Sequence, residues 1–416
     1  MSWLHTLGFL AVPVDVSETE SVLQAQLPVL EWRLNVVPKL ENSTSVQYSG
    51  VAKHKELLYL GTSNRSGILM VDQRYSTPVG RLSTEAPVQA KPTVLQEGSN
   101  THLVAVDLSG EVYSWLISPP SENQESSDIV KLEVPDSDRN VDHTLNWSVS
   151  LDIPVNTPIE TDGQSLFVST NNDIVYALDL DGNILWRFAH RVSPSRKGNL
   201  QLFGAGRPLV EAESIVVGFS DGAVLRLKKS DGTIVEKVYN GEGRYPDVIA
   251  QPTSIQGGIL ISGFEQPSYK ESQESILWSK SFGAVQGSLV DPNEGNNTLV
   301  YHAGSDGLLR KIDSTSGAVL WDWDSETSAS LTEPVWLNGQ LLIASHVGGL
   351  YIIDPTTGEE VWRSRLEYRQ TGYMQPPLVD DCTIHILSAK GFLEQYDTCN
   401  TEKEFLGNQK MSIILR

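Results

Sequence analysis

The fold of this chain is indicated by a ten-residue stretch, Ile312-Asp313-Ser-Thr-Ser-Gly317-Ala-Val-Leu-Trp321, whose layout recurs elsewhere. A later copy is Ile353-Asp354-Pro-Thr-Thr-Gly358-Glu-Glu-Val-Trp362, and an earlier one is Ala177-Leu-Asp179-Leu-Asp-Gly182-Asn-Ile-Leu-Trp186. Each copy has an apolar residue, an aspartate, a short polar turn, a glycine, an apolar segment and a tryptophan. Trp321 and Trp362 lie 41 residues apart. A period of about 42 residues built from short strands is typical of a β-propeller, in which each repeat forms one blade.

A second series of glycines supports this period. Gly307, Gly349 and Gly391 are spaced by 42 residues, and each opens a short strand. Eight blades separated by turn residues can be traced between residues 30 and 406. We therefore predict an all-β fold, an eight-bladed β-propeller of four-stranded antiparallel blades. Blade five is degenerate, and its residues Glu265–Glu274 are expected to form a loop where a third strand belongs.

The first strand-like segment of the chain has no partner before it. Leu30-Glu-Trp32-Arg-Leu34 repeats the pattern of an outermost blade strand, Leu185-Trp186-Arg-Phe188. Since a free sheet edge invites association, we expect residues 28–36 to pair with the last blade and close the ring. Residues 1–27 would then form a flexible N-terminal segment, and residues 28–416 a single propeller domain. The apolar tail Lys410–Leu415 could compete for the same edge.

The charge of the chain excludes several classes of partner. Among 416 residues, 52 Asp and Glu outnumber 31 Lys and Arg, giving a net charge of −21 and a pI near 4.7. Phosphate backbones and anionic lipid repel such a surface, so neither is expected to bind. No run of about 18 apolar residues is present that could span a bilayer. The apolar segment Met1–Val14 lacks a preceding basic residue and is broken by Pro13, so it is a poor signal peptide.

The repeated residues have a structural explanation. Glycine supplies the positive φ that a hairpin turn requires, and the aspartate carboxylate caps the turn. The tryptophan is large enough to pack between neighbouring blades. Aspartates about 42 residues apart lie on different blades, too far from one another to share an ion. The sequence therefore predicts no metal site and no cofactor.

The chain has two cysteines, Cys382 and Cys399. If residues 383–388 and 391–397 form a hairpin about Ala389-Lys390, the two cysteines lie near each other across the mouth of that hairpin. A disulfide is then feasible, provided that the Cα atoms lie within about 7 Å. The alternative is two free thiols in a reducing compartment.

No catalytic set is recognisable in the sequence. The eight histidines form neither HExxH nor another metal-binding spacing, and neither a GxSxG elbow nor a phosphate-binding loop is present. The repeats resemble the quinoprotein-type motif Ala-x-Asp-x-x-Thr-Gly-x-x-x-Trp, to which Ala177–Trp186 is similar but one residue short. That resemblance implies a quinone-dependent dehydrogenase as an alternative. The adjacent cysteine pair of those enzymes is absent, so no enzyme is expected. A ligand-sensing propeller excised from a receptor is a further alternative.

Two segments between blades resemble a particular family. Leu200-Gln-Leu202-Phe203-Gly-Ala-Gly-Arg-Pro208 is similar to the Leu-x-Leu-Arg-Gly-x-x-x-Pro loop that BamB proteins carry between blades three and four. Arg244-Tyr-Pro-Asp247-Val-Ile249-Ala-Gln-Pro252 is similar to their Arg-Leu-x-Asp-x-Asp-x-x-Pro loop between blades four and five. BamB proteins are periplasmic lipoproteins of the outer-membrane β-barrel assembly (BAM) complex. In that family both loops contact a POTRA domain of the barrel-inserting protein BamA.

The resemblance implies a partner-binding site formed by Leu200, Leu202, Phe203, Arg244 and Asp247. Phe203 stands where the family has Arg, and Ile249 where it has a second Asp. An interface here would accordingly be less ionic and more hydrophobic than in the family. The alternative is that the leucines fill the seam between blades.

The prediction is a non-catalytic scaffold or adaptor. The resemblance implies that it lies in the periplasm at the outer membrane, with a lipid anchor on its native precursor, although no cysteine near the N-terminus could carry the lipid. Its expected partner is the BamA POTRA domain. Its blade edges could also bind unfolded outer-membrane proteins by β-augmentation.

Overall fold

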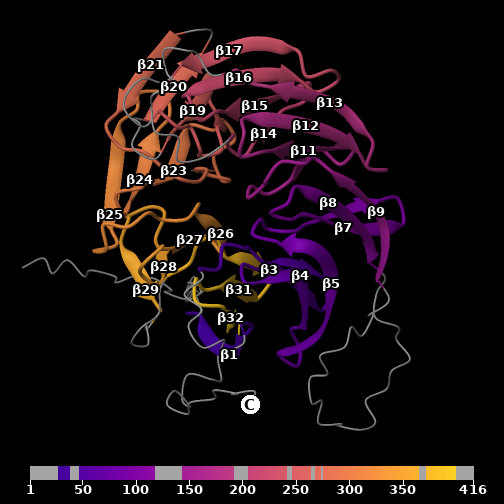
Figure 1. The fold of residues 1–416 in the computed structure, drawn as a ribbon. Coiled ribbons are helices and arrows are strands. Elements are labelled where there is room, and N and C mark those ends of the chain that lie inside the picture. Colours follow the sequence, from indigo (N-terminus) through magenta and orange to yellow (C-terminus); the bar gives the residue numbers. More distant parts are fainter. Residues whose placement is uncertain are drawn as a thin grey trace, which may run out of the picture.

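The computed structural model describes residues 27–37, 46–117, 143–191, 205–240, 246–263, 268–272, 275–364 and 372–399. These residues form eight four-stranded antiparallel sheets, arranged around a common centre like the blades of a propeller (Figure 1). The predicted all-β propeller of four-stranded blades is therefore present, and the number of sheets agrees with the eight blades traced in the sequence. No helix among the described residues could cross a membrane.

The blades are numbered in the order in which they follow along the chain. Blade one contains β2 (Ala52–His54), β3 (Leu57–Thr62), β4 (Arg65–Asp72) and β5 (Thr77–Pro87), and blade two contains β6 (Thr93–Glu97), β7 (Asn100–Val106), β8 (Glu111–Ile117) and β9 (His143–Ser150). Blade three contains β10 (Glu160–Thr161), β11 (Ser165–Ser169), β12 (Ile174–Asp179) and β13 (Ile184–Ala189), and blade four contains β14 (Leu209–Val210), β15 (Ser214–Gly218), β16 (Ala223–Lys228) and β17 (Ile234–Asn240).

The second half of the ring repeats this plan. Blade five contains β18 (Thr253–Ile255), β19 (Gly258–Ile261), β20 (Ser268–Ser272) and β21 (Ser275–Lys280), and blade six contains β22 (Leu289–Val290), β23 (Leu299–Ala303), β24 (Leu308–Asp313) and β25 (Val319–Asp324). Blade seven contains β26 (Val335–Leu337), β27 (Gln340–Ala344), β28 (Leu350–Ile353) and β29 (Glu360–Arg363), and blade eight contains β30 (Leu378–Asp380), β31 (Thr383–Leu387), β32 (Phe392–Asp397) and β1 (Val29–Asn35).

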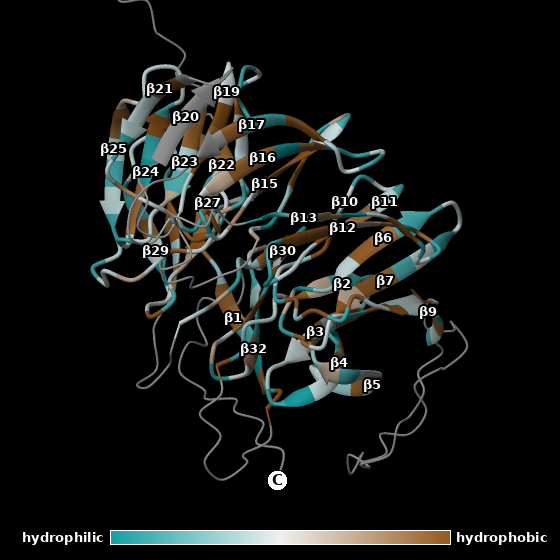
Figure 2. Ribbon diagram, turned by 45° about the horizontal axis from the view of Figure 1, so that its top comes forward, coloured by the Kyte–Doolittle hydropathy of each residue, from teal (hydrophilic) through white to brown (hydrophobic). Residues whose placement is uncertain are grey.

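Within each blade the strands run from the centre outwards. First strands of neighbouring blades contact each other, as β10 and β14 do, whereas outermost strands expose apolar residues such as Leu185 of β13. The middle strands are buried, and β15 and β16 are apolar along most of their length (Figure 2). The buried apolar side chains form eight clusters, each shared by two adjacent blades. The core of the described part is thus a ring of interfaces between adjacent blades, which we call seams.

The N-terminal strand β1 closes the ring. It pairs antiparallel with β32 and becomes the outermost strand of blade eight, with Trp32 opposite Gln395 and Arg33 opposite Glu394. The predicted closure is confirmed. Because blade eight combines strands from both ends of the chain, its pairing joins the first blade to the last. Apart from Leu27, the predicted N-terminal segment lies outside the described residues, as does the tail Lys410–Leu415.

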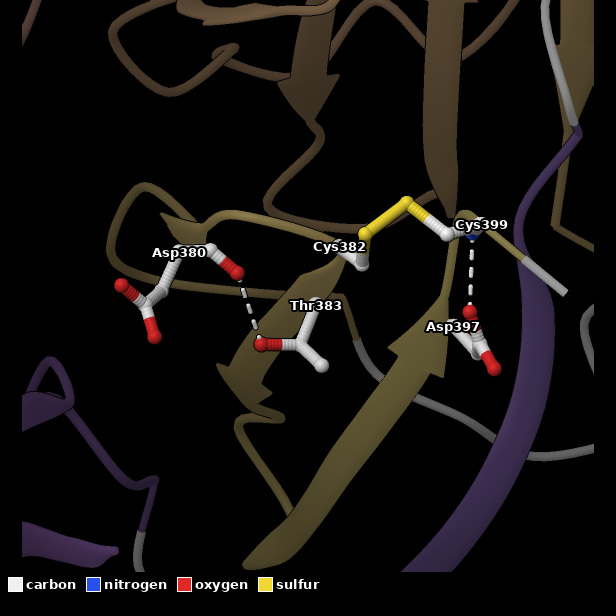
Figure 3. The surroundings of a disulfide bond; sticks show 5 residues. All are labelled: Asp380, Cys382, Thr383, Asp397 and Cys399. Atoms are coloured by element: carbon white, nitrogen blue, oxygen red, sulfur yellow. Dashed lines mark hydrogen bonds between the residues drawn. A yellow bond between two sulfur atoms is a disulfide. The ribbon is translucent and has the colours of Figure 1, made fainter. Parts of the chain in front are cut away.

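A disulfide joins Cys382 to Cys399 at the open end of the β31–β32 hairpin (Figure 3), with the two Cα atoms 5.3 Å apart. Thr383 pairs with Asp397 in this hairpin, and the N–H of Thr398 donates to the carbonyl of Cys382 at 2.8 Å. The disulfide that the sequence made feasible is therefore present. It ties β32 to β31 independently of β1.

The expectation of a loop at Glu265–Glu274 is wrong. Residues Ser268–Ser272 form β20, which pairs with β19 on one side and β21 on the other. Its sequence, Ser-Tyr-Lys-Glu-Ser, has no apolar alternation that would indicate a strand. Backbone hydrogen bonds to two neighbours stabilise a strand even when its side chains are polar, so the sheet decides the structure of this segment.

The repeated Asp, Gly and Trp act together at the seams. In blade six, Oδ1 of Asp313 accepts hydrogen bonds from the backbone N–H of Thr315 and Ser316, each at 2.8 Å. Gly317 has a φ of 71°, and a Cβ there would lie 2.6 Å from the ring of Trp278 in blade five. The Trp278 indole N–H donates to the Ser314 carbonyl at 3.0 Å. We call this contact between a tryptophan and the next blade's turn the Trp–turn lock.

Among the described residues, four seams carry the Trp–turn lock. The indole donors and carbonyl acceptors are Trp147 and Leu180 at 2.7 Å, Trp186 and Lys229 at 2.6 Å, Trp278 and Ser314 at 3.0 Å, and Trp321 and Pro355 at 3.2 Å. The glycines of the accepting turns, Gly182, Gly232, Gly317 and Gly358, all have positive φ and lie against the ring. The structural role predicted for the repeated residues is confirmed.

Candidate partner-binding site

Most of the predicted partner-binding residues, namely Leu200, Leu202, Phe203 and Arg244, lie outside the described residues. Asp247 is described, and only 2% of it is exposed. Its neighbour Val248 is completely buried, and its N–H donates to the carbonyl of Phe219 in blade four at 3.2 Å. The loop between blades four and five is therefore anchored on blade four, and Asp247 belongs to this anchor rather than to the exposed surface.

The end of the loop between blades three and four is anchored at the same place. The N–H of Ala205 donates to the Thr170 carbonyl of blade three at 3.1 Å, and that of Gly206 donates to the Gly218 carbonyl of blade four at 2.8 Å. Gly206 also lies against Val248, because a Cβ there would come within 2.9 Å of the Val248 carbonyl oxygen. The described ends of both loops thus meet beside the end of β15, on one face of blade four.

A buried polar cluster supports this face where the first loop begins. His190, just after β13, has its Nε2 at 3.0 Å from Oδ1 of Asp221, and its ring stacks on Phe219 with centroids 4.5 Å apart. Asp173 accepts hydrogen bonds from both the N–H and the hydroxyl of Ser220. Burial raises the pKa of Asp173. These contacts join the β11–β12 and β15–β16 connections and give the loop bases a rigid support.

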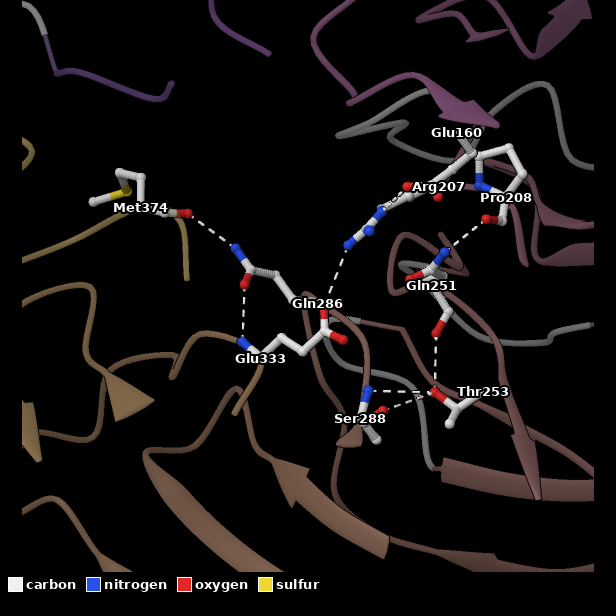
Figure 4. A network of polar contacts seen from close by, with 9 residues as sticks. All are labelled: Glu160, Arg207, Pro208, Gln251, Thr253, Gln286, Ser288, Glu333 and Met374. Carbon is white, nitrogen blue, oxygen red and sulfur yellow. Dashed lines mark hydrogen bonds and ion pairs between the residues drawn. The ribbon is translucent and has the colours of Figure 1, made fainter. Parts of the chain in front are cut away.

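The first loop also reaches the centre of the ring through Arg207 (Figure 4). Arg207 Nε donates to Glu160 of blade three, and Arg207 Nη1 lies 3.3 Å from Oε2 of Glu333, which precedes β26 of blade seven. In a ring of eight blades, three and seven face each other, so Arg207 extends across the axis.

Two glutamines extend this network to further blades. Gln286, which precedes β22, accepts the N–H of Glu333 at 2.9 Å and donates to the carbonyl of Met374 at 2.9 Å. Gln251, which precedes β18, donates to the Pro208 carbonyl at 2.7 Å. Together with Arg207, they connect blades three to eight near the centre. We call Glu160, Arg207, Gln251, Gln286 and Glu333 the axial network.

The charges of the axial network compensate one another. Burial would lower the pKa of Arg207, but the carboxylates of Glu160 and Glu333 outweigh it and raise that pKa. Burial raises the pKa of Glu333. The pKa of nearby Lys91 is lowered, first by burial and then by the positive charge of Arg207. This arrangement is suited to holding blades together. In the part of the chain that the structure describes, no three His, Cys, Asp or Glu residues are placed to hold a metal ion.

Reasoning from the sequence missed the axial network, although a signal was present. A polar residue stands directly before the proline that opens several blades: Lys91-Pro92, Arg207-Pro208, Gln251-Pro252, Glu333-Pro334 and Gln375-Pro376. Each of these prolines stands one or two residues before the first strand of its blade. This signal covers Arg207, Gln251 and Glu333 of the axial network, on blades four, five and seven, but neither Glu160 nor Gln286.

Comparison with known proteins identifies the family. The family described as "Outer membrane protein assembly factor BamB" matches residues 140–294 and 305–404. A relative of that description from Legionella pneumophila (strain Paris) is 25% identical over 206 residues, 47% of this chain and 52% of the relative. Another, from Alkalilimnicola ehrlichii, is 27% identical over 203 residues, 47% of this chain and 51% of the relative. The chain spans about half the length of these curated relatives.

The fold has a counterpart among solved structures. The crystal structure of BamB from Moraxella catarrhalis superposes with a TM-score of 0.63 at 15% identity, covering 89% of this chain and all of that chain. At this identity the likeness concerns the fold. The family match is the stronger finding, since residues 140–294 and 305–404 make up more than half of the 416 residues. The chain therefore belongs to the BamB family of outer membrane protein assembly factors.

Proposed function

We propose that this chain is a non-catalytic scaffold in the assembly of outer-membrane β-barrel proteins. The observation that carries the proposal is the convergence of two inter-blade loops on one face of blade four, each anchored by backbone hydrogen bonds at its described end. The family supports it as well, since its members are described as outer membrane protein assembly factors. Residues 28–416 act as one propeller domain in this proposal.

The partner in this proposal is a POTRA domain of BamA, bound by Leu200, Leu202, Phe203 and Arg244. Asp247 is buried, so in this proposal it holds the shape of the second loop and does not contact the partner. A rigid base supports such binding, because little conformational entropy is lost when preorganised loops meet a partner. Apolar residues at the middle of an interface contribute most of its binding energy.

The proposed location is the periplasm, at the outer membrane, with a lipid anchor on the native precursor. The Cys382–Cys399 disulfide supports an oxidising compartment.

The test is binding of the purified chain to the isolated POTRA domains of BamA. The variant Leu200→Glu/Leu202→Glu should bind at least about tenfold more weakly, since two apolar anchors are lost. The matched control is Ile184→Glu/Leu185→Glu on β13, where the two residues are 44% and 50% exposed, and it should bind like the native chain. Undiminished binding by the folded loop variant would refute the proposed site.

The rim of the propeller supports a second role, toward unfolded client proteins. Leu185, Val235, Leu277 and Leu320 are each 50–59% exposed on an outermost strand, and each stands at a β-bulge of that strand. A bulge interrupts the free edge and limits strand addition, so clients would contact these side chains. Replacing all four with serine should weaken suppression of client aggregation, and Leu200→Glu/Leu202→Glu should not. Equal suppression by the serine variant would dismiss the role.

A further inference from the structure

The seam between blades eight and one lacks the Trp–turn lock. Trp32 of β1 corresponds to Trp278 and Trp321, since each follows the bulge of an outermost strand. Yet the Trp32 indole N–H is buried and has no hydrogen-bond partner among the described residues. The side-chain oxygen of Gln73, in the turn that Trp32 should meet, is likewise buried without a partner.

The reason lies in the turn of blade one. Ser76 is the fourth residue after Asp72, as Gly317 is after Asp313 and Gly358 after Asp354. Ser76 has the same left-handed backbone, with a φ of 48°. At Gly317 and Gly358 a Cβ would come within 2.7 Å of the tryptophan ring. Because Ser76 carries a Cβ, Trp32 cannot stack on this turn as its counterparts do.

Other contacts hold β1 and limit how far the seam can open. Arg33 Nε donates to Glu394 at 2.8 Å, and the N–H of Val36 donates to the Gly391 carbonyl at 2.9 Å. Near the centre, Lys53 of blade one forms an ion pair with Asp380 of blade eight. The disulfide keeps β32 on β31 whether or not β1 is present. The outermost strand can therefore leave while the rest of blade eight stays folded and joined to blade one.

We propose that β1 is a releasable strap, which detaches from β32 before any of the four locked seams opens. Release bares the backbone of β32 as a free strand edge, which an extended segment of another chain can join. The strap is a property of the fold and goes beyond the proposed loop contacts.

Hydrogen–deuterium exchange on the whole protein tests the strap. Amides of residues 29–35 should exchange at least about tenfold faster than those of β13 and β25, whose tryptophans form the lock, a difference of about 1.4 kcal/mol in opening free energy. Ser76→Gly should slow exchange in β1, because it lets Trp32 form the lock. In a Trp32→Phe background the same substitution should not slow it, since phenylalanine lacks the indole N–H.

The control for backbone strain is Ser328→Gly, because Ser328 also has a left-handed φ, 50°, but lies in the connection between blades six and seven. It should leave exchange in β1 unchanged. Exchange in β1 as slow as in β13 and β25 would overturn the proposal. So would slowing by Ser76→Gly that is equally large with Phe at position 32.

Discussion

Replacing Arg33 with methionine tests what closes the ring. The carboxylate of Glu394 is completely buried and accepts hydrogen bonds from Arg33 Nε at 2.8 Å, the Tyr373 hydroxyl at 2.8 Å and the Tyr396 hydroxyl at 3.0 Å. Burial raises the pKa of both tyrosines, so they remain neutral donors. Arg33 is then the cation that balances this carboxylate, and it comes from the opposite end of the chain.

The expected loss follows from the burial of the pair. Removing one partner of a buried ion pair costs about 3–5 kcal/mol, because the remaining charge is left uncompensated. The Arg33 side chain is 18% exposed, so we expect the lower end, about 3 kcal/mol. Arg363→Met is the matched control, since Arg363 follows Trp362 as Arg33 follows Trp32. Its side chain is 47% exposed, and its loss should cost less than about 1 kcal/mol.

The assay is urea unfolding followed by tryptophan fluorescence, for the native chain, both single variants and Arg33→Met/Glu394→Gln. The double variant buries no charge at this position, so it should recover at least half of the stability that Arg33→Met loses. The reasoning is refuted if Arg33→Met and Arg363→Met are equally stable. It also fails if the double variant is no more stable than Arg33→Met.

Four further predictions concern pH, the disulfide, the turns and the closing strand. Burial lowers the pKa of His302 and His385 to about 4, below the ordinary value of 6.5. The unfolded chain therefore takes up protons that the folded chain does not as pH falls from 6.5 to 4, and stability should fall in that window by up to about 3 kcal/mol per histidine. Urea titrations at pH 7.5 and 4.5 measure this loss, which His385→Gln should reduce; an unchanged loss would contradict it. Reducing the disulfide, whose cysteines are 17 residues apart, should cost about 3 kcal/mol, and Cys382→Ser/Cys399→Ser should show the same loss with no response to reductant. Gly317→Ala should cost about 2 kcal/mol or more, because it adds a clash with Trp278 to the left-handed φ, whereas Gly339→Ala, with open space around it, should cost about 1 kcal/mol; equal losses would argue against the lock. Deleting residues 28–36 should cause early melting or aggregation, and an unchanged melting curve would argue against closure by β1.

The part of the fold that was predictable rests on local contacts. Asp313, Gly317 and the apolar residues around them define a turn and its two strands within ten residues, so their recurrence indicated blades. The number of blades followed from tracing short strands between turn residues along the chain. Trp32-Arg33 marked β1 as an outermost strand because it repeats Trp186-Arg187 and Trp362-Arg363. The expected register of one hairpin made the Cys382–Cys399 disulfide feasible, and the structure shows it. Each of these inferences needed only a short local pattern and its recurrence along the chain.

What only the tertiary structure decided depends on residues that meet once the ring is complete. Arg207 contacts Glu160 and Glu333 from 47 and 126 residues away, so nothing near it in the sequence shows its partners. The strand Ser268–Ser272 exists because two neighbouring strands satisfy its backbone, not because its side chains favour one. Asp247 matched a family motif, but only packing on blade four shows that it is buried. The strands and turns of each blade are set by hydrogen bonds between residues close in the sequence. The contacts at the axis and at the seams join residues from different blades, so they form only when the chain closes into a ring.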